Sequence, residues 1–280
     1  MRIHQYKYLN KLGNLRWIAL LFGAFLLAWN WSERVSGPTP LQWNIQFLPI
    51  LLALVLMLPN FWLETLRWKV AKNIFGGKNR GFIPNWREVM AGQFISFVSP
   101  GRMGQFLGRI AFEKGAKEKQ KLLKASLLCS AMNTFCLVGL GLLSSIGPNA
   151  FQLGMLLPIA KKQSKQHVTL FGLTLLRILV FATQWFILIP NIPFQRVFQF
   201  LGSLTVVGWG PIGNLFIREN LALFLFPEIE TSTVLSASVL LWCINLLFPA
   251  LFGLYYLIRH FDWSFRNRLS RAVDLDSAKA

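Results

Sequence analysis

Acidic side chains are scarce in this chain of 280 residues. Eleven Asp and Glu residues stand against 29 Lys and Arg, so the formal net charge is +18 at pH 7. Charged residues of both signs make up only 14% of the sequence, whereas soluble domains carry about a quarter. Because 54% of the residues are apolar, this composition is not typical of a soluble protein.

Cysteine and histidine are also rare, with three residues of each. The cysteines (Cys129, Cys136 and Cys243) lie in apolar runs without CxxC or His–Cys spacing, so we interpret them as small buried side chains. The sequence has no nucleotide-binding P-loop, no Ser–His–Asp arrangement and no carboxylate-rich metal motif. We therefore expect no metal, no cofactor and no enzymatic activity.

Long apolar runs are abundant, and several approach the roughly 20 residues that cross a bilayer as a helix. They predict an all-α membrane protein, a polytopic helical bundle formed by a single integral membrane domain. The clearest predicted spans are about 15–32, 45–68, 167–189 and 234–258.

The basic residues gather in short clusters beside these runs, in the N-terminal arm, after the second run, within 114–124, in 161–165 and in the tail. Such clusters mark cytoplasmic loops and attract anionic lipid headgroups, so we do not expect a nucleic-acid partner. We expect a multi-pass protein of the bacterial cytoplasmic (inner) membrane, with the N- and C-termini in the cytoplasm.

The segment 88–112 has basic residues on both sides, so both of its ends should be cytoplasmic. A re-entrant helical hairpin meets this requirement, since two half-helices of about ten residues reach only about 15 Å. The break is predicted at Ser99–Pro100–Gly101, with Ser99 as an N-cap and Pro100 in the first turn of the second half-helix.

A second re-entrant hairpin is predicted at 197–226, where a Gly–Pro break lies between flanks that look external. For both termini to be cytoplasmic, the number of full spans must be even. We therefore divide 122–160 into two short crossings that meet near Gly139–Ser145.

The two broken segments share the pattern G-x-[MI]-G-[QN]-[FL]-[LF]-x-R, at Gly101–Arg109 and Gly210–Arg218. Their topologies match in opposite orientations, which predicts an inverted repeat, an architecture common among transporters. Repeat 1 covers about 15–141, repeat 2 about 143–258, and 259–280 form a cytoplasmic tail.

Charged residues at membrane depth usually face protein or a cavity, since exposing one to lipid costs about 3 kcal/mol or more. In the first hairpin, Arg102, Gln105 and Arg109 share one helix face near a half-helix N-terminus, and the glycines give access to the backbone. This arrangement suits a phosphate. The alternative is that Arg109 snorkels to the interface and Arg102 pairs with Glu64.

The other candidate residues lie on neighbouring segments. Glu64 and Arg67 are expected to form a local ion pair, although Arg67–Trp68 is also typical of an interface anchor. Arg177 lines the path or pairs with Glu219. Arg218 and Glu219 are adjacent in sequence, so each is expected to have another partner. The candidate substrate-binding residues are Glu64, Arg67, Arg102, Gln105, Arg109, Arg177, Asn214, Arg218 and Glu219.

The segments NFWLETLRW, GQFISFVSPGRMGQFLGR and GWGPIGNLFIRENLAL resemble marker segments of the lysylphosphatidylglycerol synthase transmembrane region, a flippase-like membrane family. The resemblance covers about 15–258 and implies a lipid translocase fold with re-entrant helices. The family usually has Glu where this chain has Gln105, which leaves the site more positive and favours an anionic headgroup. Only about 20 polar residues follow 258, so we do not expect the chain to synthesise lysylphosphatidylglycerol.

The functional prediction is a translocator of a phospholipid or lipid-linked intermediate with an anionic headgroup. In this prediction Arg102, Arg109 and Arg218 bind phosphate, and Gln105 and Asn214 bond to headgroup atoms. Two alternatives remain open. One is a non-transporting membrane partner that scaffolds a lipid- or glycan-modifying enzyme, and the other is a transporter of small solutes or ions.

Overall fold

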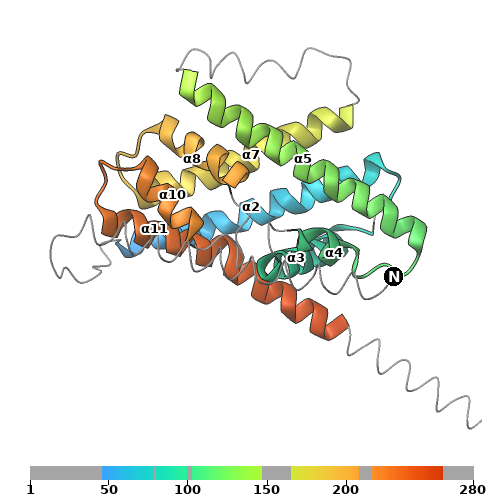
Figure 1. The fold of residues 1–280 in the computed structure, drawn as a ribbon. Coiled ribbons are helices and arrows are strands. Elements are labelled where there is room, and N and C mark those ends of the chain that lie inside the picture. Colours follow the sequence, from blue (N-terminus) through green and yellow to red (C-terminus); the bar gives the residue numbers. More distant parts are fainter. Residues whose placement is uncertain (1–45, 79, 100–102, 147–164, 208–215, 261–280) are drawn as a thin grey trace, which may run out of the picture.

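The computed structural model describes residues 46–78, 80–99, 103–146, 165–207 and 216–260. Within these ranges every regular element is helical (Figure 1). The elements are α2 (Phe47–Ile74), α3 (Phe82–Val98), α4 (Gly104–Ile110), α5 (Ala116–Ile146), α7 (Lys165–Leu188), α8 (Phe194–Val207), α10 (Ile217–Leu225), α11 (Thr231–Trp242) and the π-helical segment η3 (Cys243–Leu247).

Four described helices are long and apolar enough to cross a membrane: Phe47–Ile74, Ala116–Ile146, Lys165–Leu188 and Thr231–His260. The shortest has 24 residues, or about 36 Å of helix against a hydrocarbon core of about 30 Å. These helices support a multi-pass membrane protein and confirm the helices predicted at 45–68, 167–189 and 234–258. The predicted span at 15–32 and both chain ends lie outside the described residues.

Helix α5 is longer than the sequence suggested. It continues without a break from Ala116 to Ile146, so the predicted turn near Gly139–Ser145 is wrong. A Cβ atom at Gly139 would meet nothing within 4 Å, which means that no neighbour forces the helix to end there. The second short crossing, expected at 147–160, lies outside the described residues.

Helices α3 and α4 form a tight pair on either side of the predicted break. The N–H group of Gly104 donates to the Ser99 hydroxyl at 2.7 Å, so α4 begins at Gly104 and not near Pro100. A Cβ atom on Gly104 would lie 2.2 Å from the Ile95 carbonyl oxygen, and one on Gly108 2.4 Å from that of Ala91. These glycines therefore bring two helix backbones together, as small-xxx-small pairs do in membranes, rather than exposing backbone to a headgroup.

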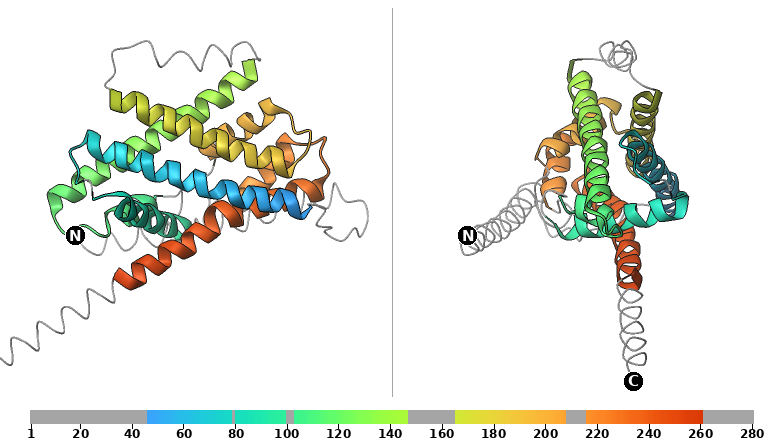
Figure 2. Two further views of the ribbon diagram at one scale, coloured as in Figure 1. Left: turned by 180° about the vertical axis from the view of Figure 1, so that it is seen from behind. Right: turned by 90° about the vertical axis from the view of Figure 1, so that its right-hand side faces the viewer.

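The second pair of short helices is α8 and α10, and residues 208–215 between them lie outside the described residues. Helix α8 packs closely on α5 where Gly202 faces Gly141, since a Cβ atom at Gly141 would lie 3.1 Å from the Gly202 Cα. In Figures 1 and 2 the α3–α4 pair lies toward one end of the long helices and the α8–α10 pair toward the other.

Two apolar clusters pack the bundle. One joins α2, α3, the first half of α5 and Leu170 of α7, around the buried side chains of Trp68, Val89 and Leu122. The other joins the second half of α5 to α7, α8, α10, α11 and the start of α2, around Trp185 and Phe198. On α5, the stretch between the two clusters carries the polar side chains of Ser130, Asn133 and Thr134.

The π-helical segment η3 interrupts the long C-terminal helix. It lies just before Pro249, whose ring nitrogen cannot donate to the carbonyl of Asn245 four residues earlier. The backbone accommodates this loss with a wider turn, in which the Phe248 N–H donates to the Cys243 carbonyl. The turn places Asn245 toward the middle of the bundle, where it is 8% exposed.

We expect Gly108→Ala to destabilise the protein by about 1–3 kcal/mol, because the added methyl group overlaps the Ala91 carbonyl and pushes α4 from α3. The matched control is Gly139→Ala, whose methyl group meets nothing within 4 Å and removes a helix-interior glycine. Thermal unfolding in detergent measures both. Equal midpoints for Gly108→Ala and Gly139→Ala would contradict the close packing of α3 and α4.

Candidate functional site

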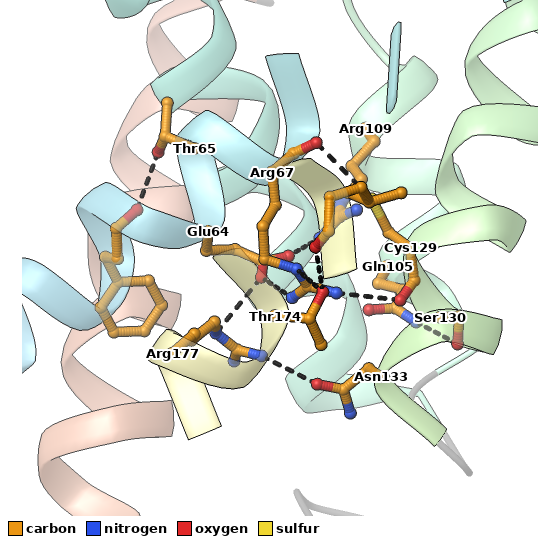
Figure 3. A network of polar contacts seen from close by, with 12 residues as sticks. Glu64, Thr65, Arg67, Gln105, Arg109, Cys129, Ser130, Asn133, Thr174 and Arg177 are labelled. Carbon is orange, nitrogen blue, oxygen red and sulfur yellow. Dashed lines mark hydrogen bonds and ion pairs between the residues drawn. The ribbon is translucent and has the colours of Figure 1, made fainter. Parts of the chain in front are cut away.

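One carboxylate, that of Glu64 on α2, is surrounded by three arginines from three helices (Figure 3). One carboxylate oxygen accepts a hydrogen bond from Arg109 Nη2 at 2.5 Å. The other accepts from Arg67 Nη1 at 2.5 Å and lies 3.2 Å from Arg177 Nε. Glu64 and Arg109 are only 4% and 2% exposed, so this is a buried ion cluster.

Arg67 fixes the cluster to its surroundings. Its Nε donates to the Thr174 hydroxyl on α7 at 2.9 Å, and its Nη2 donates to the Cys129 carbonyl on α5 at 2.9 Å. The Arg109 guanidinium stacks over the Trp68 ring, 4.9 Å from its centroid. Arg67 therefore joins three helices, and Trp68 supports Arg109 by a cation–π contact.

The cluster lies beside a cavity of about 260 Å³ that every described helix helps to line. Polar side chains of α2, α3, α4, α5, α7, α8 and α10 and of η3 face it, together with apolar side chains that include Leu241 of α11. The polar and charged lining residues are Asn60, Glu64, Arg67, Gln93, Gln105, Arg109, Ser130, Asn133, Thr134, Arg177, Thr205, Arg218 and Asn245.

The cavity lies halfway along the membrane-length helices. Asn60, Ser130, Arg177 and Asn245 are lining residues, and each is at or next to the midpoint of its own helix. If the four helices cross the bilayer, this polar cavity lies near its midplane. Binding sites of transporters commonly occupy that level.

Arg218 and Glu219 form a second ion pair at the start of α10. Arg218 Nη2 lies 2.6 Å from Glu219 Oε1 and donates to the Ser238 carbonyl, and the Ser238 hydroxyl donates to Glu219. The other carboxylate oxygen of Glu219 accepts the N–H of Phe216, whose φ of 69° bends the chain into the helix. Arg218 lines the cavity and Glu219 lies behind it.

The charges of this site do not balance. Four arginines and one glutamate are found among the described lining residues, which leaves an excess of three positive charges. Including Glu219 behind Arg218 reduces the excess to two. Arg109 Nε is also buried and has no hydrogen-bond partner in the described structure. The described lining therefore carries surplus positive charge and one buried N–H donor without a described acceptor.

Six of the nine residues predicted from the sequence line this one cavity. They are Glu64, Arg67, Gln105, Arg109, Arg177 and Arg218. Glu219 contacts the cavity only through Arg218, whereas Arg102 and Asn214 lie outside the described residues. The local Glu64–Arg67 ion pair is confirmed.

Several predicted contacts are wrong. Arg109 does not snorkel to the interface, because it is buried against Glu64. Arg177 contacts Glu64 rather than Glu219, and Arg67 is not an interface anchor, since it is 1% exposed.

Arg218 and Glu219 pair with each other, and each also has the further partner expected from the sequence, because Arg218 donates to the Ser238 carbonyl and Glu219 accepts from the Phe216 N–H. Both lie in the first turn of α10, and the long arginine side chain folds back to reach the carboxylate of its neighbour.

Sequence reasoning missed two groups of polar residues. Asn60, Gln93 and Asn245 line the cavity. Single amides inside apolar runs, as in LPNFW and CINLL, are the sequence signal from which these buried polar residues could have been predicted. Lys72 belongs to the basic cluster that follows the second apolar run, but its side chain is buried. Its Nζ lies 2.8 Å from Glu88 Oε2 and so ties α2 to α3.

We expect Glu64→Gln to lower the free energy of unfolding by about 3–5 kcal/mol, since two buried guanidiniums and the partly buried one of Arg177 lose the carboxylate they share. Thermal unfolding in detergent is the measurement. The control is Glu118→Gln, which removes a solvent-screened i, i+3 pair with the half-exposed Lys121 and should leave the unfolding midpoint nearly unchanged. An unchanged midpoint for Glu64→Gln would contradict the central role of this carboxylate.

In comparisons with known proteins, no family model, curated protein or solved structure matches the chain.

Proposed function

We propose that the protein is a flippase-like translocator of a phospholipid or lipid-linked intermediate with an anionic headgroup. The observation that carries the proposal is the cavity midway along the membrane-length helices, with four arginines and one glutamate among its described lining residues.

The charge excess is the physical reason for an anion. A buried charge is costly unless an opposite charge compensates it. Glu64 is shared by three arginines, and both of its oxygens are already engaged. A phosphate entering the cavity would supply the missing negative charge, and guanidinium groups match its oxygens with paired donors.

The size of the cavity suits a headgroup rather than a whole lipid. A volume of about 260 Å³ corresponds to roughly nine waters at about 30 Å³ each. The acyl chains would therefore remain in the bilayer while the headgroup crosses between the helices. This arrangement also explains why the long helices have apolar outer faces, with Leu58, Trp62 and Phe135 among the exposed side chains.

The two pairs of short helices are the proposed gates. Gln105 and Arg109 of α4 and Arg218 of α10 reach the same cavity from pairs that lie toward opposite ends of the long helices. As re-entrant hairpins of an inverted repeat, they would open the cavity alternately to the two sides. The sequence has no nucleotide-binding motif, so a gradient or a partner protein would drive the movement.

The resemblance of NFWLETLRW and GQFISFVSPGRMGQFLGR to the flippase-like family agrees with this proposal. Four of the candidate residues, Glu64, Arg67, Gln105 and Arg109, belong to those two segments and meet at the cavity. The substrate class is inferred from the charges of the cavity rather than from the family.

Proteoliposomes containing a fluorescent anionic phospholipid test the proposal. Arg177→Gln and Arg218→Gln should each slow its transbilayer movement about tenfold or more, because each removes a charged donor from the cavity. The matched control is Arg80→Gln. Arg80 pairs with Glu113 away from the cavity and is half-exposed, so this variant should move lipid at the wild-type rate.

Two outcomes would overturn the proposal. If the wild-type protein moves no anionic phospholipid, a scaffolding role in a membrane enzyme complex becomes the better explanation. If Arg177→Gln and Arg218→Gln move lipid as fast as Arg80→Gln, translocation does not pass through this cavity.

A further inference from the structure

A chain of side-chain amides crosses the bundle and ends at the cavity. Gln184 Nε2 donates to the Ala53 carbonyl at 2.7 Å, and Gln184 Oε1 accepts from Asn245 Nδ2 at 2.9 Å. Asn245 Oδ1 in turn accepts from Asn60 Nδ2 at 2.9 Å. The chain has a fixed direction, because a backbone carbonyl can only accept and therefore orients every amide after it.

Because of this direction, the last acceptor of the chain has no donor within it. Asn60 uses its NH₂ group toward Asn245, so its carbonyl oxygen, Oδ1, is the free end of the chain. Asn60 lines the cavity, is 3% exposed, and its Oδ1 has no partner in the described structure. Gln93 Oε1, from α3, is a second lining acceptor with no described partner, and Gln93 is 6% exposed.

Buried acceptors without partners are uncommon, and each calls for a donor. An ammonium group is a poor candidate, since the described lining carries an excess of positive charge. Neither carboxylate has an oxygen left for it, because Glu64 binds three arginines and Glu219 binds Arg218, Ser238 and the Phe216 N–H. A neutral hydroxyl donates a hydrogen bond without adding charge.

The donor and acceptor parts of the cavity are close enough to meet one headgroup. Asn60 precedes Glu64 by four residues, so the two lie on one face of α2, about 6 Å apart along the axis. The arginines gathered at Glu64 would hold a phosphate, and a hydroxyl a few bonds further along the same headgroup would reach Asn60 Oδ1.

We propose that Asn60 and Gln93 select headgroups in which the phosphate is esterified to a hydroxyl-bearing alcohol, a polyol or a sugar. This inference rests on the proposed function, because it names the class of lipid that the same cavity accepts. The arginines would bind any anionic headgroup, and the two amide oxygens would distinguish among them.

Two lipids separate the contributions of charge and hydroxyl. Phosphatidylglycerol and phosphatidylpropanol carry the same phosphodiester charge and a three-carbon alcohol, and only the first has hydroxyls. Competition against a fluorescent anionic lipid on the purified full-length protein in detergent measures their relative affinities. We expect the wild type to bind phosphatidylglycerol about fivefold more tightly, the effect of about one net hydrogen bond.

The variant that tests the acceptors most cleanly is Gln93→Leu. Gln93 makes no hydrogen bond within the described residues, so its loss should leave the fold intact. We expect it to lower the preference for phosphatidylglycerol at least twofold while its affinity for phosphatidylpropanol stays unchanged. Asn60→Ala should likewise lower the preference, although it also breaks the bond to Asn245.

The matched control is Ser96→Ala. Ser96 lies one turn after Gln93 on α3 and has a buried, unpartnered hydroxyl, but it is not a lining residue. It should keep the wild-type preference. Equal affinities of the wild type for the two lipids, or an unchanged preference in Gln93→Leu, would overturn the hydroxyl selection and leave anionic lipid translocation standing. Failure to bind either lipid would overturn both proposals.

Discussion

The sharing of one carboxylate by three guanidiniums is the constraint on which the rest of this site depends. Glu64 cannot neutralise Arg67, Arg109 and Arg177 together, yet all three contact it within 3.2 Å. A buried cluster with surplus positive charge persists only where a cavity admits anions or solvent. Two other buried ion pairs of the bundle, Lys72–Glu88 and Arg218–Glu219, are balanced one to one. The imbalance at Glu64 is thus a local property of this cluster, which the other two buried ion pairs do not share.

Helix packing makes that cluster possible. Arg109 reaches Glu64 because Gly104 and Gly108 let α4 lie directly against the backbone of α3, and a Cβ atom at Gly92 would already lie 3.0 Å from Arg109 Cγ. Arg67 in turn ties α2 to α5 and α7, through hydrogen bonds to the Cys129 carbonyl and the Thr174 hydroxyl. The two apolar clusters hold the four long helices together, and the charged side chains are enclosed by the bundle, since Glu64, Arg67 and Arg109 are each at most 4% exposed.

The sequence predicts the helices well and their contacts poorly, for physical reasons. Apolar runs determine helix positions because every backbone group in lipid must be satisfied within its own helix. Charged residues inside those runs identify most of the cavity residues, because a charge at membrane depth must face protein or a cavity. The partner of each charge cannot be predicted from the sequence, since Arg109 and Glu64 are 45 residues apart and meet only through packing of α2, α3 and α4. The wrong turn in α5 came from requiring an even number of spans, because no local signal ends the helix and a glycine in open surroundings only lowers helix propensity.

Gln105 gives the clearest link between the local sequence and the charge of the site. It lies four residues before Arg109 on α4, lines the cavity and donates to the Ser130 hydroxyl at 3.4 Å. A carboxylate there would give the four lining arginines a second anionic partner and reduce the charge excess of the lining from three to two. The amide keeps the excess and adds no charge that would repel a phosphate. The surplus charge of the cavity lining therefore depends on the uncharged side chain at position 105 as much as on where the arginines lie.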